Sequence, residues 1–513
     1  MQNANAAVWL LDRHSEEGRA DKTAFREVGE GAGRTVTYGD LKHRSAIVAG
    51  ALRRAGLHRE ERVACLVLDQ IEYPALFFGA LKAGVVPVLL NTLLAPDIYR
   101  TILADCRAAM LVVSAPLFDL VRPILGDLAD LRAVVVIGDA PAGTVPWDAF
   151  LDGAEPTEAI PARADEGAFW LYSSGSTGAP KGVRHVHGAL RATAETYGAQ
   201  VLGLREDDVV HSAAKIFFAY GLGNAVTFPM AVGATTLLNP GRPTPDGVLD
   251  IIAREGPTVY CGVPTLYAAT LARMAERGVP PGRMRLCISA GEALPSDVGT
   301  RWLDAWGVDI LDGVGSTEML HIFLSNRPGD VEYGTSGTAV PGYDLRLVDE
   351  GGADVTGPDE VGELLVRGAS AADGYWNQRG KSRATFEGEW TRTGDKYVRR
   401  ADGRYVYCGR TDDMLKVSGI WVSPFEVEQA LCAHPAVLEA AVVGRDDGTG
   451  LTKPAAFVVL RDRSLAEGLD RALKDHVKDR IGKFKYPRWV EVVDDLPKTA
   501  TGKIQRFKLR APA

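Results

Sequence analysis

Along the first 330 residues, short runs of branched apolar residues alternate with segments whose apolar residues recur every three or four positions. The first pattern is typical of buried strands and the second of helices. Together they predict a strand over 62–69, a helix over 72–84 that ends at Gly84, and a strand over 85–91. Strands that alternate with helices predict parallel sheets with both faces covered. Further buried strands are predicted at 108–114, 132–139, 233–239, 257–264 and 284–291.

The pattern changes after about residue 330. Residues 335–349, 362–368 and 403–410 have the pattern of short alternating strands with turns between them, typical of an antiparallel barrel or meander. A chain of 513 residues is long enough for two to four domains. The last hundred residues or so have a pattern of their own. It predicts strands at 440–445, 455–460 and 488–494 and a helix at 469–480.

Composition narrows the class of protein. With 46% apolar and 24% charged residues, the chain is typical of a soluble globular protein. A net charge of −8 argues against a nucleic-acid partner. The six cysteines are widely spaced without a CxxC pair, which fits a reducing compartment. The N-terminus has no basic region of a signal peptide. We therefore expect a cytoplasmic protein.

The most apolar stretch, residues 75–90, is the best candidate for a membrane segment. Lys82 and Pro87 interrupt it, and it is shorter than a membrane-spanning helix. We interpret it as a buried helix, a turn and a strand, and we expect no membrane partner.

Residues 172–182, YSSGSTGAPKG, combine four small hydroxyl residues, three glycines and Lys181. This composition suits a backbone that closely approaches a phosphate. It differs from the Walker loop, because Lys181 follows Pro180 and Gly182 stands where that loop needs Ser or Thr.

Four other stretches carry candidate chemistry: SAGEALP (289–295), DGVGSTEM (312–319), TRTGDKYVRRADGRYVYCGRTDDMLKVSG (391–419) and PKTATGKIQR (497–506). Thr317 beside Glu318 suits a phosphate oxygen and the Mg²⁺ that neutralises it, although a plain turn before a strand explains them equally well. Asp395 can accept from two ribose hydroxyls or be an ordinary turn residue. Lys503 alone would be a solvated lysine.

In this order, the stretches resemble the adenylate-forming superfamily of acyl-CoA synthetases, nonribosomal adenylation domains and luciferases, from about residue 35 to 510. SAAKIFFAYGLGNAVTFPMAVGATT (212–236) and GSTEMLHIFLSN (315–326) are similar to the benzoate-CoA ligase group. The resemblance implies an α/β fold. Residues 1–411 would form a large N-terminal domain of two α/β layers plus a β-barrel subdomain. Residues 412–513 would form a small mobile α+β C-terminal domain, which rotates about a hinge at Asp412.

The resemblance also implies a reaction in two steps with ATP, Mg²⁺ and coenzyme A. A carboxylate attacks the α-phosphate, pyrophosphate leaves, and the CoA thiol then displaces AMP from the acyl-AMP. The implied substrate is benzoate or a small substituted benzoate, such as 2-aminobenzoate or a hydroxybenzoate. An enzyme that loads a carrier protein in trans is the alternative. Glu318, Asp395 and Lys503 argue against a relative that only binds nucleotide. The oligomeric state does not follow from the sequence, and a homodimer is one alternative.

The resemblance assigns Lys503, Thr317 and Glu318 to catalysis, with Glu318 on the metal. Lys503 and the backbone around Gly419, which lines the pantetheine tunnel, would reach the same site in alternate domain orientations. The β- and γ-phosphates would be held by Ser173, Ser174, Gly175, Ser176, Thr177, Gly178 and Lys181, the adenine by Gly291, Glu292, Ala293, Asp312 and Gly313, and the ribose by Asp395 and Arg410. The aryl pocket would consist of Phe218, Ala219, Tyr220, Gly315, His321 and Ile322. For His321, a satisfied core histidine is an equal alternative to a polar contact with the substrate.

Overall fold

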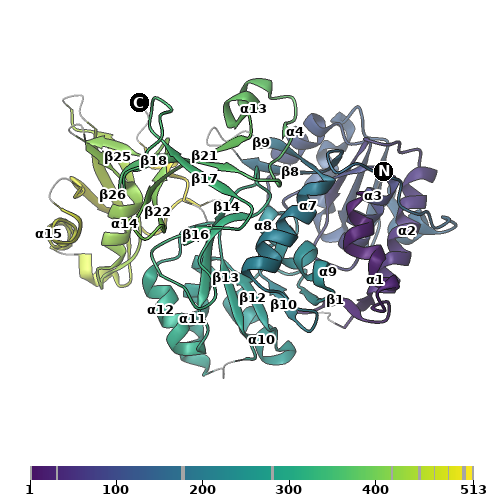
Figure 1. Ribbon diagram of the computed structural model, residues 1–513, viewed down its shortest axis with the longest axis horizontal. Helices are drawn as coiled ribbons and strands as arrows, with labels where there is room; N and C mark the ends of the chain where they lie inside the picture. The colour runs from purple at the N-terminus through teal and green to yellow at the C-terminus, as the bar shows by residue number, and fades with distance from the viewer. Residues whose placement is uncertain are drawn as a thin grey trace. The chain divides into compact units, whose positions relative to one another are not determined.

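The strands and helices of the chain are shown in Figure 1. The computed structural model describes residues 3–29, 33–174, 180–278, 282–417, 420–448, 452–466, 468–482, 485–498 and 504–510. The chain forms two compact units, one of Met1–Asp344 with Val366–Thr391 and the other of Leu345–Leu365 with Arg392–Ala513. Residues 345–365 and 392–411 thus group with the C-terminal part, whereas the resemblance implies a single N-terminal domain of residues 1–411. The predicted hinge at Asp412 stays a prediction.

The first sheet of the larger unit has eight strands in the order β19-β9-β8-β4-β3-β5-β6-β7. The six strands from β8 to β7 in this order pair in parallel, and β9 pairs antiparallel with both β8 and β19. The strands predicted at 62–69, 85–91, 108–114 and 132–139 are confirmed as β3 to β6. The bounds are β3 (Arg62–Leu66), β4 (Val86–Leu89), β5 (Met110–Ser114), β6 (Ala133–Ile137), β7 (Val145–Pro146), β8 (Gly167–Ser174), β9 (Pro180–Val186) and β19 (Gly374–Tyr375).

Both faces of this sheet are buried, as strand β3 shows. Val63 and Cys65 pack with helices α2 (Tyr38–Arg54) and α3 (Glu72–Ala83), and Ala64 and Leu66 pack with α4 (Pro96–Cys106). A strand covered on both faces is apolar at every position, which explains the continuous apolar run in the sequence.

Helix α3 ends at Gly84, which has a φ of 74° and so adopts the left-handed conformation that favours glycine at helix ends. The predicted end of this helix is therefore confirmed. No helix in the described part of the chain is long and apolar enough to cross a membrane.

The second sheet has nine strands in the order β16-β15-β14-β13-β12-β10-β11-β1-β2. The strands from β14 to β1 in this order pair in parallel, and those predicted at 233–239, 257–264 and 284–291 are confirmed as β11, β12 and β13. The bounds are β1 (Thr23–Glu27), β2 (Thr35–Thr37), β10 (Val209–Ser212), β11 (Thr235–Leu238), β12 (Val259–Gly262), β13 (Leu286–Ser289), β14 (Ile310–Gly315), β15 (Ile322–Ser325) and β16 (Thr338–Ala339).

Helices α10 (Pro245–Glu255), α11 (Pro264–Arg277) and α12 (Ser296–Trp306) lie beside strands β12 and β13 (Figure 1). The ring of Tyr267 packs edge-on against Tyr260 and Trp302, with centroid distances of 5.2 and 4.6 Å. The other helical segments of this unit are η1 (Val8–Asp12), α1 (Arg13–Glu16), η2 (Ala115–Leu117), α5 (Phe118–Val121), η3 (Arg122–Asp127), α6 (Trp147–Leu151), α7 (His187–Thr193), η4 (Ala194–Val201), α8 (Ala219–Leu222), η5 (Gly223–Thr227), α9 (Phe228–Val232) and α13 (Arg379–Thr385).

Segments α8, η5 and α9 form one helical stretch whose middle part is π-helical. A π turn inside a helix is often found at a functional site. Two of the predicted aryl-pocket residues, Ala219 and Tyr220, lie at the start of this stretch, and a third, Phe218, is its N-cap.

The expected change of pattern after residue 330 is confirmed. Five strands form a sheet in the order β17-β18-β21-β20, with β22 paired to β21, and β21 runs antiparallel to both β20 and β22. Their bounds are β17 (Asp344–Val348), β18 (Val361–Arg367), β20 (Phe386–Glu387), β21 (Trp390–Arg399) and β22 (Tyr405–Arg410).

The tail has a three-stranded sheet in the order β25-β26-β27 and a two-stranded sheet of β23 and β24. The predicted strands and the predicted helix of the tail are confirmed, within a few residues at their ends. The bounds are β23 (Leu415–Val417), β24 (Ile420–Val422), α14 (Pro424–Cys432), β25 (Val437–Asp446), β26 (Thr452–Leu460), η6 (Arg463–Ala466), α15 (Leu469–Ile481), β27 (Trp489–Val492) and η7 (Arg506–Lys508).

Helices α2 and α3 approach closely at Gly79. A Cβ atom there would lie 2.5 Å from Cγ1 of Val48 and 2.9 Å from the carbonyl oxygen of Ser45. Gly79→Ala should therefore lower the free energy of unfolding by about 1–3 kcal/mol, the usual cost of overpacking, measured by urea denaturation.

The matched control is Gly380→Ala, because Gly380 also lies in a helix but a Cβ there would meet nothing within 4 Å. Alanine favours the helix over glycine, so this variant should be as stable as the parent or more so. Equal effects of the two substitutions would contradict the close packing of α2 on α3.

Candidate active site

The glycine-rich stretch connects two adjacent strands. Strand β8 ends at Ser174 and β9 begins at Pro180, and Ser173 is paired with Lys181 across the antiparallel ladder. The buried Oγ of Ser173 makes no hydrogen bond within the described part of the chain, so it is a polar atom that a ligand can satisfy. Gly175, Ser176, Thr177 and Gly178, together with the side chain of Ser174, lie outside the described residues.

The strands on both sides of this stretch are anchored to the end of helix α4. The hydroxyl of Tyr172 donates to Oδ2 of Asp105 at 2.6 Å. The backbone N–H of Trp376 donates to the carbonyl of Gly182 at 2.8 Å, and its indole Nε1 donates to the carbonyl of Asp105, also at 2.8 Å. Sequence reasoning missed Asp105 and Trp376, because they lie far from the motif in the chain.

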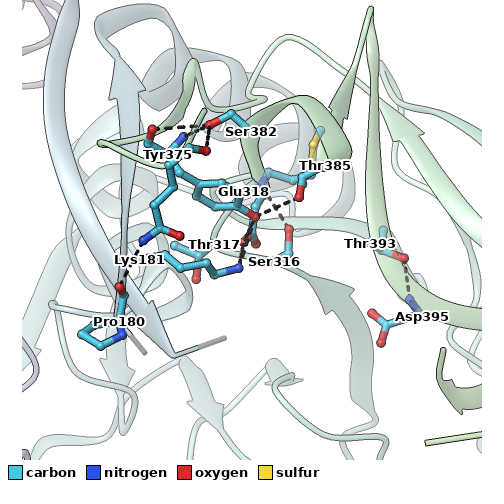
Figure 2. A network of polar contacts seen from close by, with 12 residues as sticks. Pro180, Lys181, Ser316, Thr317, Glu318, Tyr375, Ser382, Thr385, Thr393 and Asp395 are labelled. Atoms are coloured by element: carbon cyan, nitrogen blue, oxygen red, sulfur yellow. Dashed lines mark hydrogen bonds and ion pairs between the residues drawn. The ribbon is translucent and has the colours of Figure 1, made fainter. Parts of the chain in front are cut away.

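Lys181 and Glu318 lie together with Tyr375 (Figure 2). The Lys181 Nζ is 3.3 Å from Oε1 of Glu318 and 3.2 Å from the hydroxyl of Tyr375. The Tyr375 hydroxyl is 2.8 Å from the same carboxylate oxygen. The structure thus joins two predicted site residues directly, and it adds a third that sequence reasoning missed.

Burial acts to raise the pKa of Glu318, but the charge of Lys181 and the hydrogen bond from Tyr375 act against it. The net effect is a pKa below the ordinary value, so this carboxyl is ionised at neutral pH. An ionised carboxylate beside a lysine is a suitable group to meet a metal ion and a phosphate.

The turn that carries Ser316, Thr317 and Glu318 is fixed by local hydrogen bonds. The Ser316 Oγ accepts from the backbone N–H of Met319 at 3.1 Å, and the carbonyl of Glu318 accepts from the N–H of Ala372 at 2.8 Å. Leu320 has a φ of 65°, an uncommon conformation for a branched side chain. The predicted motif is therefore a tightly held turn after β14.

His185 on β9 supports this turn and was not identified from the sequence. Its Nε2 lies 2.8 Å from the carbonyl oxygen of Thr317, and its ring stacks on Phe169 at 5.1 Å. Burial lowers the pKa of His185 to about 4, so the ring is neutral and Nε2–H donates to that carbonyl.

The two stretches predicted around the adenine follow adjacent strands. Ser289 at the end of β13 is paired with Asp312 on β14, and Oδ2 of Asp312 accepts from the N–H of Leu294 at 3.3 Å. Gly291 has a φ of 97°, which favours glycine, and a Cβ there would point into open space. The residues Gly291, Glu292, Ala293, Asp312 and Gly313 therefore lie at the carboxyl ends of parallel strands, where ligands of such sheets bind.

Burial raises the pKa of Asp312 to about 8. Its bond to Leu294 identifies Asp312 as a side chain that holds the 289–295 stretch against β14. A direct contact of Asp312 with a nucleotide stays a prediction.

Asp395 and Arg410 belong to the smaller unit and face each other across β21 and β22. The Nη1 of Arg410 lies 3.0 Å from Oδ1 of Asp395 and donates to the carbonyl of Thr393, also at 3.0 Å. The backbone N–H of Asp395 donates to Oγ1 of Thr393 at 3.1 Å (Figure 2). Arg410 therefore orients the carboxylate that was predicted to bind the ribose.

Four of the predicted aryl-pocket residues are close neighbours. Gly315 pairs with Ile322 across β14 and β15, and a Cβ on Gly315 would lie 2.5 Å from the carbonyl oxygen of His321. The ring centroids of Tyr220 and His321 are 5.7 Å apart. The other two predicted residues, Phe218 and Ala219, lie at the start of α8, just before Tyr220.

The hydroxyl of Tyr220 is 3.0 Å from the carbonyl oxygen of Ile288 and 3.1 Å from that of Gly262. A phenol has one proton to donate, so this hydroxyl is occupied by the ends of β12 and β13. A contact of the Tyr220 ring with an aryl acid stays a prediction.

His321 is surrounded by aromatic rings and is only 2% exposed. Its centroid lies 4.5 Å from that of Phe228 and 5.3 Å from that of Tyr197. Burial lowers the pKa of His321 to about 3, so the imidazole is neutral. Its Nε2 is 3.3 Å from the carbonyl of Tyr220 and carries the proton, which leaves Nδ1 as an acceptor with no partner among the described residues.

Among the residues that the structure describes, no group of three His, Cys, Asp or Glu side chains is placed to hold a metal ion. Mg²⁺ at a nucleotide site is usually bound by one or two carboxylates plus the phosphates, so Glu318 alone fits such a role. Lys503 and Gly419 lie outside the described residues, and Asp412 lies in an exposed turn after β22.

The chain matches two known families over most of its length. The AMP-binding enzyme family matches residues 11–376, and the AMP-binding enzyme C-terminal domain matches residues 426–503. These matches confirm the resemblance found in the motifs.

Related proteins match from end to end. The benzoate–CoA ligase of Thauera aromatica is 55% identical over 510 residues, which cover 99% of this chain and 96% of that protein. The 4-hydroxybenzoate–CoA/benzoate–CoA ligase of Rhodopseudomonas palustris is 53% identical over 515 residues, with 99% and 94% covered. A crystal structure of the anthranilate CoA ligase AuaEII in complex with anthranoyl-AMP is 44% identical, with a TM-score of 0.93 and 99% and 97% covered. The chain therefore belongs to the AMP-binding enzyme family, in the adenylate-forming superfamily.

Proposed function

We propose that this protein is an AMP-forming aryl-acid CoA ligase that activates benzoate or a small substituted benzoate. The observation that carries the proposal is the neutral, aromatic surrounding of His321, directly after the turn that holds Glu318. Flat apolar walls suit an aryl ring, and the adjacent charged pair suits the phosphates of ATP. The names of the relatives support the same substrate class.

The chemistry asks little of the side chains. A carboxylate is already a nucleophile, so the barrier comes from bringing two anions together and from the charge that develops at phosphorus. Lys181 would hold the β- and γ-phosphates and Thr317 the α-phosphate. Glu318 would bind Mg²⁺, which neutralises charge on the phosphates when bound.

The other predicted roles complete the proposal. The 289–295 stretch, held by Asp312, would flank the adenine, and Asp395 would accept from the ribose hydroxyls. Residues 412–513 would rotate about Asp412, so that Lys503 serves the first step and the backbone at Gly419 serves the second.

Benzoate is the leading substrate, followed by 2-aminobenzoate and the hydroxybenzoates. Incubation of the protein with ATP, Mg²⁺, CoA and each of these acids should release AMP and form the aryl-CoA thioester. Release of pyrophosphate with neither AMP nor thioester would instead support the alternative of a carrier protein that accepts the acyl group in trans, because AMP stays in the aryl-AMP until a thiol displaces it. The absence of AMP release with every aryl acid would contradict the proposed function.

The unpartnered Nδ1 of His321 can accept a hydrogen bond from a hydroxyl or amino substituent on the ring. His321→Phe keeps a flat ring but removes this acceptor. We expect the kcat/KM of a substituted benzoate, relative to that of benzoate, to fall roughly three- to tenfold, as expected for one hydrogen bond.

Both acids are measured on the same variant, so any general loss of activity cancels in the ratio. An unchanged ratio for all 2-, 3- and 4-substituted hydroxy- and aminobenzoates would show that Nδ1 does not read the substituent.

Lys503 should act only in adenylation, where its ammonium would bridge the acid carboxylate and the α-phosphate. Lys503→Ala should reduce acid-dependent pyrophosphate exchange by roughly a hundred- to a thousandfold, as when one donor to a developing oxyanion is removed. The same preparation should convert supplied benzoyl-AMP and CoA to benzoyl-CoA at nearly the parent rate. Parallel loss of both half-reactions would contradict the two-orientation mechanism, and unimpaired exchange would contradict the role of Lys503.

A further inference from the structure

We propose that Tyr375 is a positioning residue, whose hydroxyl orients the Glu318 carboxylate for magnesium-dependent nucleotide binding. The proposal rests on the proposed function, since it assumes that Glu318 meets the metal. Tyr375 lies outside the glycine-rich stretch and the turn at 316–318, and it touches the predicted side chains of both (Figure 2).

The backbone of Tyr375 is fixed beside the glycine-rich stretch. Strand β19 pairs antiparallel with β9, and Tyr375 lies opposite Val183, two residues after Lys181. The N–H of Tyr375 donates to Oγ of Ser382 at 3.0 Å, and its ring packs against Phe386 at 5.3 Å. The position of the hydroxyl is therefore set by the fold and does not depend on Glu318.

The hydroxyl of Tyr375 has one proton and two lone pairs to share. The ionised Glu318 can only accept, so the proton points to its Oε1 at 2.8 Å. The Lys181 ammonium can only donate, so it meets a lone pair of the Tyr375 oxygen at 3.2 Å. Thr385 Oγ1 lies 3.4 Å from the same oxygen. The neutral hydroxyl thus joins a cation and an anion without adding charge.

Three contacts join Lys181, Glu318 and Tyr375 to one another, and nucleotide binding would change the two that Lys181 makes. Lys181 would be drawn toward the phosphates, and Glu318 would turn part of its charge to the metal. The hydrogen bond from Tyr375 to Glu318 can persist through both changes. It uses only one carboxylate oxygen, and the position of the hydroxyl is set by strand β19. Tyr375 is therefore the partner that can keep Glu318 oriented in both states.

Partners of metal-binding side chains usually affect metal affinity strongly, with losses of roughly 10- to 100-fold when they are removed. Tyr375→Phe removes only the hydroxyl. It keeps the ring over which Lys181 Nζ lies, 4.5 Å from the centroid, and the packing on Phe386.

The test measures ATP binding to the full chain by calorimetry over a series of Mg²⁺ concentrations, together with acid-dependent pyrophosphate exchange. In Tyr375→Phe, the half-saturating Mg²⁺ concentration should rise roughly 10- to 100-fold in both measurements. ATP affinity without Mg²⁺ should change far less, and conversion of supplied benzoyl-AMP and CoA should stay at the parent rate. A merely structural role would not separate these quantities.

The matched control is Tyr38→Phe, which also removes a buried tyrosine hydroxyl, one that donates to the carbonyl of Ala234 at 2.7 Å. It should leave the Mg²⁺ dependence unchanged. Glu318→Gln separates the role of Tyr375 from the metal role of Glu318. If Glu318 binds the metal, this variant should shift the half-saturating Mg²⁺ concentration upward or remove the Mg²⁺ dependence of ATP binding. A shift caused by Glu318→Gln but not by Tyr375→Phe overturns the role of Tyr375 alone. No shift in either variant overturns the metal role of Glu318 and with it this inference.

A thermal melt confirms that each variant is folded. If Tyr375→Phe is not folded, Thr385→Val takes its place, because it removes the other neutral neighbour of the hydroxyl. Thr385→Val should shift the Mg²⁺ dependence in the same direction by a smaller factor. An unchanged dependence in that variant would then count against the proposal.

Discussion

The ion pair between Lys181 and Glu318 connects the two sheets of the larger unit, in each of which most strands are parallel. Lys181 comes from β9 at one side of the eight-stranded sheet, and Glu318 comes from the turn after β14 of the nine-stranded sheet. Burying both charges costs hydration, and an apolar pair of the same shape would often be as stable. The pair is therefore better explained by what it can bind than by what it adds to stability.

The neighbouring contacts serve to keep these two charges in place. His185 holds the carbonyl of Thr317, and Asp105 holds the strands on both sides of the glycine-rich stretch, directly and through Trp376. None of these residues is proposed to touch the reacting atoms of a substrate. They fix the backbone from which Lys181 and Glu318 extend, so only these two side chains have to adjust when a nucleotide binds.

The sequence was most informative where one short segment determines its own structure. The helix ending at Gly84 and the buried strand at 62–66 follow from glycine and from continuous apolar residues, and the glycine-rich and acidic turns are recognisable by composition. Tyr375 and His185 could not be predicted in the same way, since a tyrosine or histidine in a strand is usually a core residue. Their importance comes from the register of β9 with β19 and from the position of β9 beside the turn at 316–318, which is tertiary information. The grouping of residues 345–365 with the C-terminal part likewise depends on pairing across the chain.

Gly223 lies directly against His321, one of the residues predicted to form the aryl pocket. A Cβ at this position would lie 2.3 Å from Cδ2 of His321, so the imidazole occupies space that only glycine leaves vacant. Any larger residue at position 223 would push the His321 ring away from its present position against the π-helical segment η5. Within the proposed aryl pocket, the position of the His321 ring therefore depends on residue 223, which can change while every ring of the proposed pocket stays chemically the same.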